Sequence, residues 1–269
     1  MAESAIFEPQ PPYGRPMSIE EWERLDEDEP GELVDDRLEE EETADNPHEV
    51  IVSLLLRILW AWAHARRGLV LSSDTKYAVS KRRGRKPDIS VLFDGDRKLP
   101  RRGANRRPPD VMIEVVSPAP RHRRRDRIEK LRDYAAFGVR WYWLVDPEAR
   151  TLEVLCLGDD GHYVHALDAD DGAVEVPGCE GLVLDLDALW RELNERLEDE
   201  TEEPGRRSHT AARPASRRAS PAPASPSGFP ALSEPAPAVA ADRLVAGPRW
   251  TPPVRGDKTR RCSSKTGQS

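Results

Sequence analysis

An apolar run at residues 110–117, DVMIEVVS, contains an acidic residue, Glu114, in its middle. The density of Val, Ile and Met in this run predicts a buried β-strand. An ionised carboxylate is costly to bury unless it is paired with a positive group or binds a metal ion. The chain must therefore fold so that a central strand meets a compensating charge.

A second apolar run, residues 88–93, opens with another acid, Asp88. Side chains alternate along a strand, so Glu114 shares a face with Met112 and Val116, and Asp88 shares one with Ser90. If the two strands pair, Asp88 and Glu114 lie side by side, where they repel unless a proton or a cation lies between them. One or two carboxylates are the usual protein ligands of Mg²⁺, which suits metal-assisted phosphodiester hydrolysis. Taken alone, an aspartate after a proline is also typical of a turn.

A lysine on a following helix supplies a possible third group. The spacing over residues 123–138 predicts a helix with an apolar arc, formed by Ile128, Leu131, Tyr134 and Ala135. Lys130 lies at the edge of this arc, so its ammonium could reach the carboxylates while its stem packs beside Tyr134. There it could orient the attacking water or stabilise the phosphate. The alternative is a solvated lysine that pairs with a nearby acid.

Helical and strand patterns alternate through residues 17–197. The predicted helices are 18–25, with a capping box of Ser18 and Glu21, then 48–68, 123–138 and 185–197. A hairpin is expected at 31–42 around Asp35-Asp36, with strands at 69–79, 88–93, 110–117, 141–146, 151–157 and 162–167. Strands among helices predict an α/β or α+β domain.

The two ends of the chain differ from this domain in composition. Residues 198–269 are rich in Pro, Ala, Ser and Arg, and 11 of the chain's 25 prolines follow residue 199. Such a segment cannot bury enough apolar surface to offset the entropy of ordering, which predicts a disordered tail. Residues 1–16 are expected to form a flexible arm, and residues 17–197 the folded domain.

Three widely spaced cysteines favour a reduced, cytoplasmic protein. The most apolar window, residues 50–65, is interrupted by Arg57 and His64 and is too short for a membrane span.

The formal net charge of the chain is −8, but the residues after 199 contain 12 Lys and Arg and only six Asp and Glu, so the negative charge lies in the domain. This acidic domain argues against a protein that coats DNA non-specifically, but it is compatible with a local basic patch. Arg121, Arg123, Arg124 and Arg125, in RHRRRDR, form either such a nucleic-acid contact or a solvated face.

Three stretches, RKPDISVLF, PPDVMIEVVSP and DRIEKLRDYAAFGVRWYWLVDPEARTLEVL, resemble the Uma-two family of predicted bacterial endonucleases. The resemblance extends from about residue 17 to about residue 195, and its signature is most specific from Glu114 to Val154. It implies the PD-(D/E)XK restriction-endonuclease-like fold, a central mixed sheet flanked by helices. It also implies Mg²⁺, or Mn²⁺, at the acids.

The resemblance assigns roles to single residues. Asp88 matches the metal-binding aspartate of that superfamily, and Glu114 matches the glutamate of its E-x-K element. The lysine of that element would stand at position 116, where this chain has Val116, so Lys130 is matched as its substitute. Glu32 matches an acid found early in these sequences and is expected to complete the site.

Three functions remain open from the sequence. The first is a Mg²⁺-dependent DNA endonuclease, which the combination of Asp88, Glu114 and Lys130 favours. The second is an inactive nuclease fold that serves as a binding or regulatory module, which the acidic domain favours. The third is a phosphodiesterase that acts on RNA or small nucleotides. Cutting both strands of DNA commonly needs two active sites, which suggests a homodimer.

Overall fold

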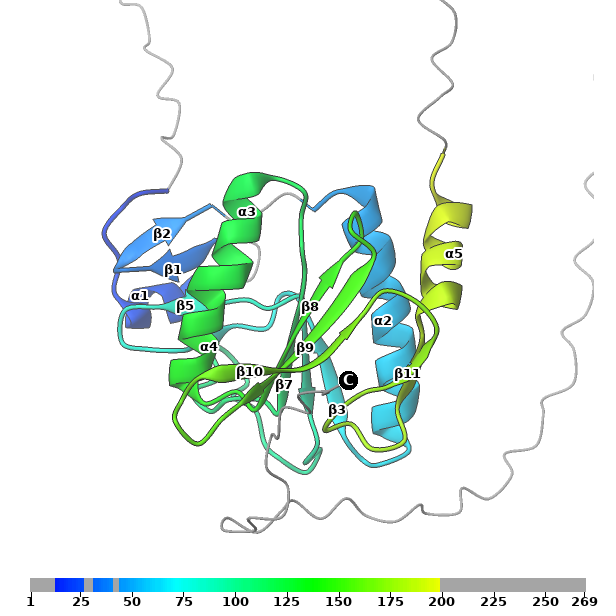
Figure 1. Ribbon diagram of the computed structural model, residues 1–269. Coiled ribbons are helices and arrows are strands. Elements are labelled where there is room, and N and C mark those ends of the chain that lie inside the picture. The colour runs from blue at the N-terminus through cyan, green and yellow to red at the C-terminus, as the bar shows by residue number, and fades with distance from the viewer. Residues whose placement is uncertain (1–12, 27–30, 41–43, 199–269) are drawn as a thin grey trace, which may run out of the picture. The chain divides into compact units, whose positions relative to one another are not determined.

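The computed structural model describes residues 13–26, 31–40 and 44–198 (Figure 1). Apart from residue 198, the predicted disordered tail lies outside these residues, as does most of the predicted N-terminal arm. Residues 13–16, the last of that arm, lie beside the hairpin, where Gly14 N donates to Leu38 O at 2.7 Å. No helix in these three ranges is both long and apolar enough to span a membrane.

A six-stranded mixed sheet forms the centre of the fold, in the order β10-β9-β8-β7-β6-β3. Its strands are β3 (Leu69–Ser72), β6 (Ile89–Leu92), β7 (Val111–Val115), β8 (Trp141–Asp146), β9 (Thr151–Leu157) and β10 (Tyr163–Ala169). Only β7 and β8 pair in parallel, and the chain crosses between them through the helix that carries Lys130. The prediction of a central mixed sheet is confirmed.

Helices cover both faces of this sheet (Figure 1). One face packs against α2 (Asn46–His64) and α5 (Leu186–Arg196), with Leu55 and Leu189 in one core cluster with Ile113. The other face packs against the helical segment made of α3 (Pro120–Arg124), η1 (Arg125–Lys130) and α4 (Leu131–Phe137). Tyr134 of this segment packs in a second cluster with Met112 of β7.

A smaller sheet of four strands lies in the order β2-β1-β5-β4. It contains β1 (Glu32–Val34), β2 (Arg37–Glu39), β4 (Tyr77–Ala78) and β5 (Gly84–Arg85), and it packs with α1 (Ile19–Arg24) through Trp22. The predicted hairpin is present, and Asp35 and Asp36 turn it with φ values of 50° and 63°. Both lie in the left-handed region, which Asp tolerates better than most residues.

Several element boundaries differ from the predictions. The strand predicted at 69–79 divides into β3 and β4, because the polar stretch from Ser72 to Thr75 forms a turn. The helix predicted to reach Gly68 ends at His64. The short strands β5, β11 (Ala173–Glu175) and β12 (Val183–Asp185) were not predicted, since two or three residues give no readable alternation.

Candidate active site

Asp88 and Glu114 lie next to each other on the central sheet, as the alternation of side chains predicted. Strands β6 and β7 pair antiparallel with Ile89 opposite Ile113, so the next residue on each side brings Asp88 opposite Glu114. Asp88 Oδ2 accepts a hydrogen bond of 2.7 Å from the backbone N–H of Val115. Glu114 is 1% exposed, while the Asp88 side chain keeps 16% of its surface accessible.

The carboxylate of Glu114 meets its compensating charge in Lys130. Lys130 Nζ lies 2.7 Å from Glu114 Oε2, and the Tyr134 hydroxyl donates to Glu114 Oε1 at 2.6 Å. The same ammonium lies 3.2 Å from Asp126 Oδ1. Lys130 is therefore a buried residue of this site, and the solvated alternative does not hold.

The helix that carries Lys130 is not a regular α-helix. Residues 125–130 form a π-helical turn, which adds one residue and rotates the preceding part of the helix. Ile128, predicted on the buried arc, is 41% exposed for this reason, while Arg125 and Asp126 are buried. The assignment of Ile128 to the buried arc was therefore wrong, and the π turn is what directs both Asp126 and Lys130 toward Glu114.

Glu32 reaches the same place from the hairpin. Its Oε2 lies 2.7 Å from Arg85 Nη1, and its Oε1 accepts from the backbone N–H of Lys86 at 2.9 Å. Arg85 is fully buried and also pairs with Asp133 of α4 at 2.7 Å. This chain of ion pairs ties β1, β5 and α4 together behind the site.

All four predicted residues, Glu32, Asp88, Glu114 and Lys130, line one cavity of about 130 Å³. The remaining lining residues come from α2 and its N-terminal approach, from the turn after β3, from the residue after β5, from β7 and from the π turn: Ala44, His48, Glu49, Val52, Ser73, Lys86, Val115, Arg125 and Asp126. Five of the lining side chains are carboxylates, and Lys86, Arg125 and Lys130 are the bases. Acids outnumber bases, so the cavity favours a cation.

Five ionisable lining residues were not predicted to belong to the site: His48, Glu49, Lys86, Arg125 and Asp126. His48 Nε2 lies 3.2 Å from Asp88 Oδ2. Its position depends on how α2 packs on the sheet, which no local pattern reveals. Lys86 precedes Asp88 by two residues, and Asp126 precedes Lys130 by four, so their spacing to predicted residues was the available signal.

The pKa values of the site follow from its burial and its excess of acid. Burial raises the pKa of Glu114 well above 4.5; Lys130 opposes the rise, while Asp88 and Asp126 add to it. Burial lowers the pKa of His48, but the hydrogen bond and charge of Asp88 outweigh it, and the net pKa is raised. Burial also acts against ionisation of Glu32, yet Lys130 and the nearby arginines lower its pKa to about 2.

A hard divalent cation fits this donor set. The raised pKa of Glu114 means that its negative charge is incompletely compensated by the protein, although Lys130 contacts it. Carboxylate oxygens are the ligands that Mg²⁺ and Mn²⁺ prefer. Asp88 and Glu114, from adjacent strands, are the residues that could hold such an ion.

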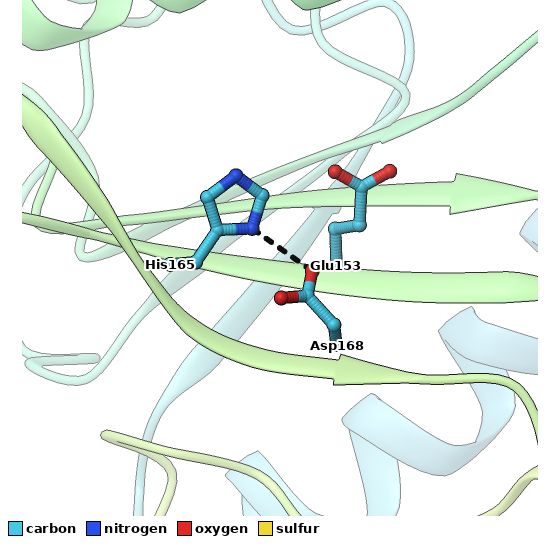
Figure 2. A group of neighbouring side chains, drawn as sticks. All are labelled: Glu153, His165 and Asp168. Carbon is cyan, nitrogen blue, oxygen red and sulfur yellow. Dashed lines mark hydrogen bonds and ion pairs between the residues drawn. The ribbon is translucent and has the colours of Figure 1, made fainter. Parts of the chain in front are cut away.

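A second group with metal-ligand chemistry lies on β9 and β10 (Figure 2). The ligand atoms of Glu153, His165 and Asp168 all lie within 4.8 Å of one another. His165 Nδ1 is hydrogen-bonded to Asp168 Oδ1 at 2.9 Å, and Glu153 pairs with Arg127. His165 and Asp168 are exposed, whereas Glu114 is buried and Asp88 is largely shielded, so this group is a poorer metal site than the cavity.

The four arginines proposed for nucleic-acid contact have different surroundings. Arg125 is buried and lines the cavity. Arg123 pairs with Glu148. Arg121 and Arg124 are exposed on α3. They therefore do not form one continuous accessible patch.

Comparison with known proteins agrees with this architecture. The family model Uma2, described as "Putative restriction endonuclease", matches residues 19–187. A solved structure from Anabaena variabilis ATCC 29413, described as a "putative nuclease belonging to DUF820", is 21% identical in sequence, with a TM-score of 0.54. The match covers 66% of this chain and 99% of that one, and at this identity it concerns the fold alone. The comparison with curated proteins gave no match.

Proposed function

The chain belongs to the Uma2 family of restriction-endonuclease-like proteins, and we propose that it is a divalent-metal-dependent endonuclease that cleaves DNA. The proposed site is the cavity lined by Glu32, Asp88, Glu114 and Lys130. Nuclease activity in general is what the family description implies. The metal, the DNA substrate and the residues are our proposal.

The observation that supports the proposal most strongly is the contact of Lys130 with Glu114. Position 116, where the E-x-K element would have its lysine, is occupied by Val116, which packs in the core cluster of Tyr134 and Tyr142. Lys130 reaches the Glu114 carboxylate at 2.7 Å from the neighbouring helix instead. An acid pair and an ammonium thus meet in one cavity, although the spacing in the sequence is different.

Each residue has a separate task in this proposal. Asp88 and Glu114 would hold Mg²⁺ or Mn²⁺, which when bound lowers the pKa of water and neutralises charge on the phosphate. The Val115 amide and His48 hold Oδ2 of Asp88 and thereby orient its carboxylate. The Lys130 ammonium stabilises negative charge that develops on a non-bridging phosphate oxygen. Glu32 holds the backbone of Lys86 at the cavity wall and pairs with Arg85 behind it.

Cleavage of plasmid DNA tests the proposal directly. The full-length chain should nick or linearise supercoiled plasmid in Mg²⁺ or Mn²⁺ and not in EDTA, and Glu114→Gln should abolish cleavage. Folded wild-type protein that binds DNA but never cleaves it would favour the inactive binding module. Cleavage of RNA or of small phosphodiesters, with plasmid left intact, would favour the third function.

A further inference from the structure

A larger hollow of about 850 Å³ lies beside the candidate active site. The turn after β3 separates the two, because Ser73 lines the small cavity while Asp74 and Thr75 line the larger hollow. Leu71 of β3 also lines the hollow, and it pairs with Ser90 of β6. Cross-strand partners point to the same face of a sheet, so Leu71 shares the face of Ser90 and Asp88. The hollow is therefore a groove on the same side of the sheet as the acids.

One wall of this groove is the most basic loop of the domain. Residues 97–107, RKLPRRGANRR, contain six arginines and lysines and no acid. Arg101 and Arg102 line the groove, are exposed, and form no ion pair within the described part of the chain. Two long cations beside each other, without acidic partners, are suited to contact phosphate groups.

The loop is held in place by the rest of the fold. Asn105 N donates to Lys76 O at 2.8 Å, and Ala78 N donates to Asn105 O at 2.9 Å, which joins the loop to β4. Arg97 donates to the carbonyl of Pro108 at 2.7 Å, and Arg106 pairs with Glu23 at 2.9 Å. A wall fixed in this way needs little ordering when a ligand binds, which favours binding.

The described acids of the groove do not outnumber its bases. Among the described residues, the other lining bases are Arg24 and Lys76, and the lining acids are Glu23, Asp26 and Asp74. Glu23 is already paired with Arg106. Asp74 is exposed on the turn toward the active site, where it would repel a phosphate.

We propose that this groove binds the backbone of the DNA beside the phosphate that is cleaved, with Arg101 and Arg102 as its phosphate contacts. The proposal rests on the proposed function in one respect, the choice of DNA as the ligand. It moves the main phosphate contacts from residues 121–125 to the loop 97–107. Binding of this kind does not depend on base sequence.

Fluorescence anisotropy with a labelled 20-base-pair duplex, in EDTA and with the full-length chain, tests the groove without any cleavage. Arg101→Ala/Arg102→Ala should weaken binding roughly tenfold at moderate salt and lower the slope of log Kd against log salt by about two. Asp74→Asn should have the opposite effect and tighten binding. The matched control is Arg57→Ala/Arg191→Ala, which removes the same charge from α2 and α5 on the other face of the sheet and should leave binding unchanged.

The outcomes separate this proposal from the proposed function. If both double variants weaken binding equally, or neither does, the groove is not the contact surface, whether or not the protein cleaves DNA. Absence of duplex binding by wild-type protein at low salt also overturns the groove. Groove-dependent binding without metal-dependent cleavage leaves the groove in place and contradicts the nuclease proposal alone.

Discussion

Glu114 occupies a position where a carboxylate is costly, and three neighbouring groups determine how it is tolerated. Lys130 and Tyr134 each donate to one of its oxygens, while Asp88 lies opposite on the next strand and adds a repelling charge. A residue needed only for packing would be apolar here, like Ile113 or Val115. The buried carboxylate and its charged partner therefore support the proposed function of the cavity.

Lys130 is the residue whose substitution separates the active nuclease from the alternatives. Lys130→Met keeps the stem beside the core but removes the ammonium, so single-turnover cleavage in Mg²⁺ should fall by roughly 10²–10³, the usual scale for one electrostatic stabiliser. Lys130→Arg should rescue only part of this loss, since a planar guanidinium does not replace a compact ammonium.

Thermal unfolding is measured alongside, because Lys130→Met leaves Glu114 and Asp126 without their shared cation. If Lys130→Met does not fold, Lys130→Arg keeps the positive charge and still tests the role. Lys81→Met, at an exposed lysine, is the control and should cleave normally. Cleavage at the wild-type rate by both Lys130 variants would exclude Lys130 from the reaction.

Among the elements, the paired strands β6 and β7 bring Asp88 and Glu114 together, and the π turn directs Lys130 toward them. The pairing of β6 with β7 aligns Asp88 with Glu114 in a way that residue alternation predicts. A regular helical wheel could not predict which residues of the helix after β7 face the sheet. The π turn changes the angle between the side chains of Asp126 and Tyr134 around the helix axis. The helical spacing placed Lys130 within reach of the carboxylates, and Lys130 contacts Glu114, but the same spacing gave a wrong burial for Ile128.

The buried ion pair of Glu32 and Arg85 joins two elements, β1 and β5, and gives a prediction on pH. The pKa of Glu32 is lowered from 4.5 to about 2 in the folded protein, so its stabilising effect is fully present above pH 4.5 and is lost as pH falls toward 2. Glu32→Gln should lower the free energy of unfolding by roughly 3 kcal/mol at pH 7, and by progressively less below pH 4.5.

Urea unfolding at pH 7 and pH 3.5 measures this difference. Glu39→Gln is the control, because Glu39 lies directly opposite Glu32 on β2 but is exposed, and it should have little effect at either pH. If Glu32→Gln lowers the free energy of unfolding by the same amount at both pH values, the stabilising effect of Glu32 does not depend on its ionisation, and the prediction is wrong.

At the scale of the whole molecule, long strands and acids within them were predictable, while long-range contacts were not. The predicted strands 141–146 and 151–157 have the bounds found in β8 and β9, because the first run is rich in aromatic residues, the second is largely apolar, and the turn DPEAR separates them. His48 and Lys86 reach the site through the packing of α2 and the smaller sheet, which depends on the whole core. The net charge of the complete chain, −8, gives no indication of the local basic loop at residues 97–107.

The proposed function depends on one divalent-metal site at Asp88 and Glu114, and the group of Glu153, His165 and Asp168 is the competing candidate. Thermal unfolding with increasing Mg²⁺ or Mn²⁺ distinguishes them, because a ligand at a hundredfold excess over its Kd stabilises the folded state by about 2.7 kcal/mol. Wild-type protein and Asp168→Asn, which alters the exposed group of Glu153 and His165, should gain stability equally. Asp88→Asn and Glu114→Gln should each gain none. A metal-induced rise in Tm that survives both Asp88→Asn and Glu114→Gln but disappears in Asp168→Asn would contradict the assignment.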